Sequence, residues 1–290
     1  MRTLLVGTAT SSWKEWLREH LGDEDLILIH PADASHGFPA RYVRLREGKV
    51  RDARFFGSLD PLRAPHVTVG TIARFSRNVS DALLLLGDLG RSPLARQTFE
   101  AVLDAYGPQK ILAPVGGHPW CPAEEMELAS SPAPAVHHAQ RRAHWIDLLE
   151  RSQRHELTTV GLRFEGTRLG TGEPLAIEGA IHAEKIGSTL YAIVEGEFDE
   201  RAISIALDRT GANKAHFVQP ETFRGLLCGL VRENGEEAGV GIIESFDLAG
   251  GTVVVRSPAV PPLPVAMLRI GALRLDREGN EVGELRPWAV

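Results

Sequence analysis

The first residues that could do chemistry form a turn between a predicted strand and a predicted helix near the N-terminus. The apolar run Leu4–Val6 leads to Gly7, small and hydroxyl residues follow, and an amphipathic run comes next. A helix N-terminus after a buried strand is where α/β proteins hold phosphate, because its free backbone N–H groups and its dipole attract an anion. The candidate phosphate-binding residues are therefore Gly7, Thr10, Ser11 and Ser12.

The residue types in this turn differ from those of a nucleotide-binding phosphate loop. A pattern G-x-x-x-x-G-K-[ST] that starts at Gly7 would need Gly at Ser12, Lys at Trp13 and Ser or Thr at Lys14. The second Gly lets the backbone fold around a phosphate, and the Ser or Thr hydroxyl is a magnesium ligand. Lys14 lies one position after the place where the pattern requires its lysine. Two interpretations stay open: a structural turn capped by a hydroxyl side chain, and a variant phosphate site.

A metal site is a further possibility that the residue types raise. His118, Cys121, His137 and His138 carry imidazole and thiolate groups, which suit zinc. Their spacings match no ligand pattern, so we expect loop residues in a Pro-rich turn and predict no metal.

Composition narrows the class of protein. The chain has 290 residues and a net charge of -6, which argues against binding nucleic acid through overall charge but allows a local basic patch. No apolar run is long enough to span a membrane, and the N-terminus lacks a signal-peptide pattern, so we expect a cytoplasmic protein. Cys121 and Cys228 are far apart and follow no pattern, which favours reduced thiols.

The N-terminal half alternates short apolar runs with amphipathic ones. Strands are predicted at Leu4–Val6, Asp25–His30, Ala82–Leu86 and Lys110–Val115, and helices at Leu94–Ala105 and His137–Arg154. Residues 31–66 are predicted to form a small hairpin or an insertion, and residues 129–135 a linker. Alternating strands and helices predict a parallel sheet with right-handed crossovers.

The C-terminal half reads as a series of short strands separated by turn residues. Strands are predicted at Val160–Phe164, Ala176–His182, Thr189–Val194, Ala202–Leu207, Leu226–Val231, Val240–Phe246, Thr252–Val255 and Val265–Leu275. Glu233–Glu236 carries a hairpin signal. The predicted fold class is thus α/β plus all-β: a parallel P-loop-like sheet with flanking helices over residues 1–155, followed by a β sandwich or barrel over residues 156–290.

One part of the β half is similar to a known family. The segments Phe223–Asp247, Thr252–Val260 and Leu268–Leu275 resemble the C-terminal domain of the polynucleotide 5′-hydroxyl kinases, which include the kinases of pre-mRNA 3′ processing and of ribosomal RNA processing. The shared pattern is a strand pair with an acidic turn and Gly-x-Gly, a strand that ends in Ser-Pro, and a closing strand with Gly and Arg.

The resemblance assigns roles to residues elsewhere in the chain. The family places a P-loop strand and helix first, a Walker-B-like strand next and an Arg-bearing lid before the β domain; the matching segments here are 4–17, 82–91 and 137–154. The resemblance implies that Lys14 pairs with phosphates, that Asp88 binds magnesium or acts as a base, and that Arg141 and Arg142 stabilise charge on a transferred phosphoryl group. Asp88 can instead cap a turn, and the arginines can form surface pairs.

Three functions follow from these observations. The first is a degenerate kinase-like protein that serves as a scaffold for RNA or for a protein partner. It is favoured by the departures at the phosphate loop and by the lack of a counterpart to the family's N-terminal β domain. A second hypothesis is a working 5′-hydroxyl kinase that uses Lys14, Asp88 and the lid arginines, with ATP and magnesium as cofactors. A third is an unrelated α/β enzyme with its site near Gly7, Asp88 and residues 116–118.

Overall fold

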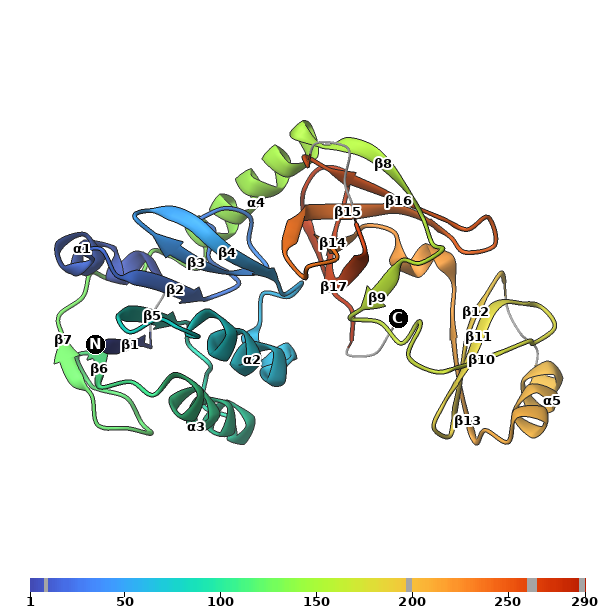
Figure 1. The fold of residues 1–290 in the computed structure, drawn as a ribbon, viewed down its shortest axis with the longest axis horizontal. Coiled ribbons are helices and arrows are strands. Elements are labelled where there is room, and N and C mark those ends of the chain that lie inside the picture. The colour runs from blue at the N-terminus through green and yellow to red at the C-terminus, as the bar shows by residue number, and fades with distance from the viewer. Residues whose placement is uncertain (8–9, 197–199, 260–264, 287–289) are drawn as a thin grey trace. The chain divides into compact units, whose positions relative to one another are not determined.

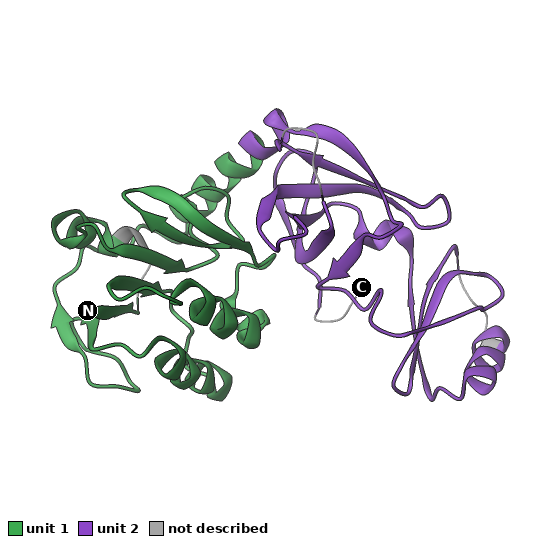
Figure 2. Ribbon diagram, in the orientation of Figure 1, with its two compact units in different colours: residues 1–146 green, residues 147–290 purple. Residues whose placement is uncertain are grey.

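The computed structural model describes residues 1–7, 10–196, 200–259, 265–286 and 290. The chain forms two compact units, residues 1–146 and residues 147–290, and the division falls within helix α4 (Pro134–Arg151) (Figure 2). The first unit has parallel strands with flanking helices and the second is built mainly of strands, so the predicted fold class is confirmed. No helix in the described ranges is long and apolar enough to cross a membrane.

The first unit is built on a seven-stranded sheet with the order β4-β3-β2-β5-β1-β6-β7 (Figure 1). Its strands are β1 (Arg2–Val6), β2 (Asp25–Ile29), β3 (Arg41–Arg46), β4 (Lys49–Phe55), β5 (Ala82–Leu86), β6 (Lys110–Pro114) and β7 (Glu124–Met126). Five of them run parallel, and the hairpin β3–β4 adds an antiparallel edge beside β2. β1 lies between β5 and β6. The predicted parallel sheet is present, and the hairpin predicted within residues 31–66 is β3–β4.

Helices cover both faces of this sheet. Leu4 and Val6 pack on one face in the same core as α2 (Pro65–Phe75) and α3 (Pro93–Tyr106). Leu5 points to the other face, where it shares a core with α1 (Thr10–His20). Because both faces are buried there, the central strands β1, β2 and β5 are nearly continuous apolar runs, and the sequence therefore predicted them, whereas the exposed edge strand β7 was not predicted.

The ends of α3 follow local signals in the sequence. Ser92 Oγ accepts a hydrogen bond from the Ala95 N–H at 3.1 Å, Pro93 occupies the first turn, and Gly107 closes the helix at φ +61°. A hydroxyl N-cap, an early proline and a left-handed glycine are the residues that helix ends favour. The helix predicted over 94–105 is thereby confirmed.

The second unit contains a seven-stranded sheet and a four-stranded sheet. The larger one has the order β18-β17-β14-β15-β16-β8, and β9 pairs with β17. Its strands are β8 (Gln153–Thr158), β9 (Arg163–Glu165), β14 (Leu226–Val231), β15 (Glu237–Asp247), β16 (Thr252–Ser257), β17 (Met267–Leu275) and β18 (Glu281–Glu284). Gly235, at φ +83°, lies in the turn that joins β14 to β15, where the sequence predicted a hairpin.

The four-stranded sheet corrects two predictions, and the first is the strand predicted at Ala176–His182, of which only residues 180–182 lie in a strand. The sheet has the order β10-β11-β12-β13, with β10 (Glu173–Leu175), β11 (Ala180–Ile186), β12 (Thr189–Val194) and β13 (Lys214–Val218). β12 and β13 are parallel, which requires a crossover, and helix α5 (Glu200–Thr210) supplies it. The strand predicted at Ala202–Leu207 is therefore wrong. Its less exposed positions, 202, 203, 206 and 207, follow the helical spacing rather than an alternation.

The two sheets of the second unit share one apolar core. Tyr191 and Ile193 of β12 lie in the same cluster as Phe223, Phe246 and the strands of the larger sheet. The Phe223 and Phe246 rings stack with centroids 4.2 Å apart. This core fixes the β14–β17 region on which a cavity of the second unit is built.

Candidate functional site at the carboxyl edge of the parallel sheet

The carboxyl ends of the central strands meet at one edge of the sheet. Val6 pairs with Leu86, and Leu86 also pairs with Ile29, so Gly7, Gly87 and His30 follow three neighbouring strands at the same level. Gly7 adopts φ +88°, which favours glycine. In open α/β sheets this edge is where ligands bind.

Asp88 occupies the exit of β5. Its side chain is exposed, and Oδ1 accepts a hydrogen bond from the Gly90 N–H at 2.8 Å. This bond caps the turn, as the alternative interpretation of Asp88 predicts. It uses one of the two carboxylate oxygens. Burial lowers the pKa of both His30 and His118, and the charge of Asp88 opposes that shift at each of them. A catalytic role for Asp88 stays a prediction.

His30 packs directly on the exit of β5. A Cβ added at Gly87 would overlap the His30 ring, so the close approach of the two strand ends requires glycine there. Burial lowers the pKa of His30, and the charges of His137 and Arg141 lower it further against the opposing effect of Asp33 and Asp88. His30 Nδ1 is buried and has no hydrogen-bond partner among the described residues. The imidazole is therefore neutral near pH 7.

A cavity of about 640 Å³ opens beside His30. α1 contributes Lys14 and Leu17, the segment after β2 contributes Asp33 and His36, and α4 contributes His137. Further lining residues are Arg18, Leu21, Glu24, Leu26, Ala34, Ser35, Leu45, Glu47, Gly48, Gln140 and His144. The cavity thus combines a surface of four leucines with a larger number of polar and charged side chains of both signs.

Asp33 and His36 set the electrostatics of this cavity. Asp33 Oδ1 accepts hydrogen bonds from the Ser35 N–H at 2.7 Å and the Ser35 hydroxyl at 2.6 Å, while Oδ2 is buried without a partner in the described part of the chain. Burial lowers the pKa of His36, Asp33 raises it, and the Lys14 ammonium lowers it. Lys14 therefore acts electrostatically on the residues after β2.

The two candidate phosphate ligands on α1 with described side chains point in different directions. Ser12 is buried, and its Oγ lies 3.1 Å from Ser131 Oγ. Lys14 is exposed and lines the cavity beside Asp33 and His36. Two positions along a helix correspond to a rotation of about 200°. The Ser12 and Lys14 side chains therefore lie on different sides of α1, and binding of one magnesium triphosphate by both stays a prediction. The side chains of Thr10 and Ser11 lie outside what the structure describes.

Arg141 and Arg142, the two arginines of the predicted lid, differ in how exposed they are on α4. Arg141 is half-buried and lowers the pKa of His30, whereas Arg142 is exposed; both side chains have partners within the protein. The structure therefore brings Arg141 and Asp88 within electrostatic reach of one histidine. Arg142 is not among the residues that line the cavity.

His118 and Cys121 belong to an aromatic loop after β6. The His118 ring stacks on Phe99 with centroids 4.3 Å apart, and its Nδ1 lies 3.4 Å from the Trp120 N–H and 3.7 Å from Cys121 Sγ. Burial lowers the pKa of His118, as does Arg91 against Asp88, and burial raises the pKa of the Cys121 thiol. Within the described ranges no three His, Cys, Asp or Glu residues are grouped to hold a metal ion.

Sequence reasoning missed His30, Asp33 and His36. The run before His30 was recognised as a strand, and the carboxyl ends of parallel strands lie at one edge. That rule would have placed His30 at the same edge of the sheet as Asp88. The course of the following loop, which brings Asp33 and His36 to the cavity, has no comparable signal in the sequence.

Comparison with known proteins supports the resemblance seen in the sequence, although no protein-family model matches the chain. A polyribonucleotide 5′-hydroxyl-kinase of Thermococcus kodakarensis is 25% identical over 264 residues, which cover 82% of this chain and 71% of the relative. A polyribonucleotide 5′-hydroxyl-kinase of Methanocaldococcus jannaschii is 29% identical over 75 residues, or 25% of this chain and 21% of the relative.

Solved structures with the same fold are complexes of Clp1p with Pcf11p. One wild-type complex superposes with a TM-score of 0.55 at 8% identity and covers 94% of this chain and 74% of the neighbour. A second structure, of an extended Pcf11p–Clp1p interface, gives a TM-score of 0.51 at 10% identity with the same coverage. The predicted resemblance to the polynucleotide 5′-hydroxyl kinase family is confirmed.

Proposed function

We propose that this chain, a relative of the polynucleotide 5′-hydroxyl kinases, is a degenerate kinase-fold protein that binds RNA as a scaffold and does not transfer phosphate efficiently. The observation that carries the proposal is the separation of Ser12 and Lys14 on α1. A phosphate loop needs its lysine and its hydroxyl on the same phosphates and metal. Here Ser12 is buried against Ser131, and Lys14 lies in the cavity on the other side of the helix.

The chemistry of the cavity supports RNA as the ligand. Lys14 supplies a positive charge, and the leucine side chains of α1 and β2 supply a surface for the face of a base. His30 Nδ1 and Asp33 Oδ2 are polar atoms without partners among the described residues, and such groups can satisfy the edge of a base. Both curated relatives carry names that describe action on polyribonucleotides.

The test combines a binding assay and a transfer assay on the full chain. A fluorescent oligoribonucleotide with a 5′-hydroxyl end is titrated at low salt, and radiolabelled ATP with magnesium is supplied separately to look for transfer. We expect RNA binding that weakens in Lys14→Gln, no transfer, and no rise of the melting temperature with ATP and magnesium, because a ligand that binds the native state alone must raise it. Lack of RNA binding would overturn the proposal.

A second function, an active ATP-dependent 5′-hydroxyl kinase, is favoured by one observation. The charges of Asp88 and Arg141, from two different elements, both act on the pKa of His30. ATP and magnesium would then be cofactors. Transfer that disappears in Lys14→Ala and Asp88→Ala would establish this function and end the scaffold proposal. The unrelated α/β enzyme is set aside, because the similarity to the kinases extends over most of the chain.

A further inference from the structure

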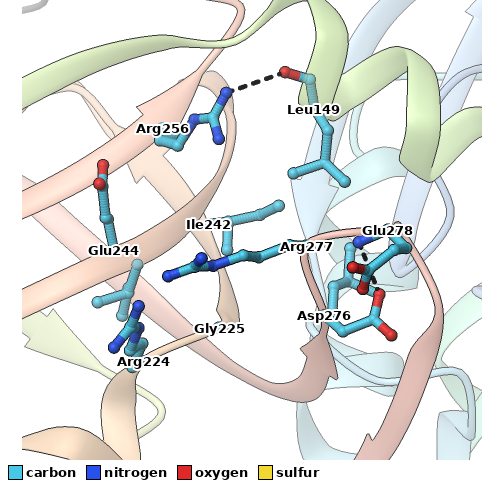
Figure 3. Close-up of a pocket in the computed structure, with 11 residues that line it drawn as sticks. Leu149, Arg224, Gly225, Ile242, Glu244, Arg256, Asp276, Arg277 and Glu278 are labelled. Atoms are coloured by element: carbon cyan, nitrogen blue, oxygen red, sulfur yellow. Dashed lines mark hydrogen bonds between the residues drawn. The ribbon is translucent and has the colours of Figure 1, made fainter.

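The second unit contains a cavity of about 580 Å³ that none of the kinase-like residues line (Figure 3). Its walls come from the end of α4 at Leu149, the segment before β14 at Arg224, strand β16 at Arg256, and the turn between β17 and β18 at Arg277. We call this cavity the arginine pocket. Residues Ile242–Glu244 of β15 and Leu275 of β17 complete it.

The backbone around the arginine pocket departs from regular pairing. The register shifts between Ile243 and Ser245 in the β15–β16 pair, and between Arg274 and Leu275 in the β17–β18 pair. Bulges of this kind re-aim side chains and are common beside binding sites.

Gly225 forms a fixed part of the pocket wall. Its N–H donates to the Ile243 carbonyl at 2.8 Å, and its own carbonyl accepts from the Leu275 N–H at 2.9 Å. Its φ is +79°, and an added Cβ would lie 2.8 Å from the Leu275 carbonyl oxygen. Glycine therefore ties β15 to β17 at this point and leaves the wall free of a side chain.

The pocket holds three guanidinium groups with unused hydrogen-bonding capacity. Arg256 donates one hydrogen bond to the Leu149 carbonyl at 3.4 Å, whereas the side chains of Arg224 and Arg277 have no partner among the described residues. Arg277 extends across the opening in Figure 3. Each guanidinium carries five N–H donors in a planar fork, so the pocket offers a surplus of donors to an anionic ligand.

The carboxylates of the pocket are partly engaged in other contacts. Asp276 Oδ1 accepts from the Glu278 N–H at 2.9 Å and the Asn280 N–H at 2.8 Å, and Oδ2 accepts from the Asn280 side chain at 2.8 Å. Glu244 Oε2 lies 3.8 Å from Arg154 Nε. Glu244 and Glu278 stay exposed and can accept hydrogen bonds.

This mixed lining selects among anionic ligands. Phosphate groups and acidic peptides present acceptors, which suit the guanidinium groups but not the exposed carboxylates. A single RNA strand presents phosphate acceptors together with 2′-hydroxyl and amino donors, and its bases stack on guanidinium planes and apolar side chains. Leu149 and Ile242 supply the apolar part.

We propose that the arginine pocket binds a segment of single-stranded RNA, with backbone phosphates on Arg224 and Arg277 and a base against Leu149 and Ile242. Glu244 accepts a hydrogen bond from a 2′-hydroxyl or a base amino group. The choice of RNA rests on the proposed function, whereas the location of the site does not.

The experiment compares two double variants of the full chain. Arg224→Gln with Arg277→Gln removes two charges from the pocket. Arg201→Gln with Arg209→Gln removes the same charge from exposed positions of α5, which does not line the pocket. Binding of a fluorescent, unstructured oligoribonucleotide is measured by anisotropy from 50 to 200 mM salt, and circular dichroism checks that both variants are folded.

We expect the pocket variant to bind about tenfold more weakly at low salt, with a salt dependence shallower by about one to two in log–log slope, since each lost phosphate contact releases fewer counterions. The α5 variant should match the unmodified chain. RNA binding that depends on Lys14 but not on Arg224 and Arg277 would overturn the arginine pocket and leave the proposed function standing. Lack of RNA binding by the unmodified chain would overturn both.

Discussion

The candidate kinase residues at the carboxyl edge of the parallel sheet and two arginines of the arginine pocket differ in whether they have partners within the protein. At the sheet edge the groups that a kinase would need also stabilise the fold: Asp88 caps its own turn and Ser12 bonds to Ser131. In the arginine pocket, Arg224 and Arg277 have no side-chain partner among the described residues, and they project from a fixed β framework.

Under the proposed scaffold function, this difference would explain how the kinase fold is kept while the phosphate loop changes. The cores and caps of the first unit depend on apolar strands and helix ends, whereas a phosphate loop depends on a few positions in one turn. Substitutions in that turn leave the sheet intact. Binding residues of the proposed scaffold can then lie outside the segments that resemble the kinase motifs, as in the arginine pocket.

The largest expected effect tests whether α1 is anchored as a structural helix. Trp13 is fully buried and shares a core with Leu5 and Leu17, whereas Trp16 is half-buried and stacks on His20. We expect Trp13→Ala to lower the free energy of unfolding of the first unit by about 3–5 kcal/mol, because it removes a large side chain from a packed core. Urea denaturation followed by fluorescence measures it.

Trp16→Ala is the matched control on α1. It should lower the free energy of unfolding clearly less than Trp13→Ala does. Equal losses for the two tryptophan variants would mean that burial of Trp13 does not hold α1 in place, and the structural role of α1 at the sheet edge would fail.

The next effect concerns the wall of the arginine pocket. Gly225 and Gly235 adopt nearly equal φ values, +79° and +83°, but only Gly225 faces a backbone oxygen where a Cβ would lie. Gly225→Ala should destabilise the second unit by about 2–3 kcal/mol and Gly235→Ala by about 1 kcal/mol, since both pay for a left-handed residue and one also meets a close contact. Thermal unfolding measures the difference, and equal shifts would remove the argument for a fixed wall.

A smaller effect is expected from the buried carboxylate of the second unit. Burial alone would raise the pKa of Glu184, but hydrogen bonds from His182, Gly170 and Gly172, with the charge of His182, hold the pKa below its usual value. The carboxylate therefore stabilises the fold above the unfolded pKa of about 4.3, and the contribution is lost as the pH falls through the folded pKa.

Glu184→Gln should cost about 1–2 kcal/mol at pH 7, where it replaces charge-assisted hydrogen bonds, and little in acid. Unfolding curves at pH 7 and pH 3 measure the difference. A penalty that is independent of pH would contradict this account.

His30 makes the stability of the first unit depend on pH in a different range from that of Glu184 in the second unit. Its folded pKa is lowered, first of all by burial, so the unfolded chain binds a proton more readily than the folded chain. The stability of the first unit should therefore fall as the pH drops below about 6.5, toward the folded pKa. Hydrogen exchange read separately on the two units should show the first unit loosening at higher pH than the second, and His30→Asn should reduce that difference, while His36 and His118, whose pKa values are also lowered, retain the rest.

The smallest effect is expected at Ser12. Ser12→Ala removes the hydrogen bond to Ser131 and should cost about 0.5–1.5 kcal/mol. RNA affinity should not change, because Ser12 does not line the cavity that holds Lys14. Anisotropy titration checks this, and a clear loss of affinity would return Ser12 to the binding site.

The parts of the fold that the sequence could predict are those with local signals. β1, β2, β5 and β6 are apolar runs bounded by turn residues, and α3 carries its own caps. α2 (Pro65–Phe75) was not predicted, because Val and Thr residues and a glycine make it a weak helix by propensity. Its burial of Ile72 and Phe75 against the sheet stabilises it instead.

The sites were harder to predict because they depend on strand order. The rule for parallel strands placed Gly7 and Asp88 at one edge, but the separation of Ser12 from Lys14 required the exact start of α1. Arg224, Arg256 and Arg277 are far apart in the sequence. They share a pocket because β14 lies between β17 and β15, and β15 lies beside β16, an arrangement that no local pattern encodes.

The central place of β1 also governs when the first unit can assemble during translation. Arg2 pairs with Ala82 and Thr3 pairs with Lys110, so both neighbours of β1 are synthesised long after it. At about 5–20 residues per second, the nascent strand waits roughly 4–16 s for its first partner. The hairpin β3–β4 can pair locally in that interval, whereas Leu4, Leu5 and Val6 stay unpaired apolar residues near the ribosome. The strand at the centre of the finished sheet is thus the one that waits longest for its partners while the first unit is made.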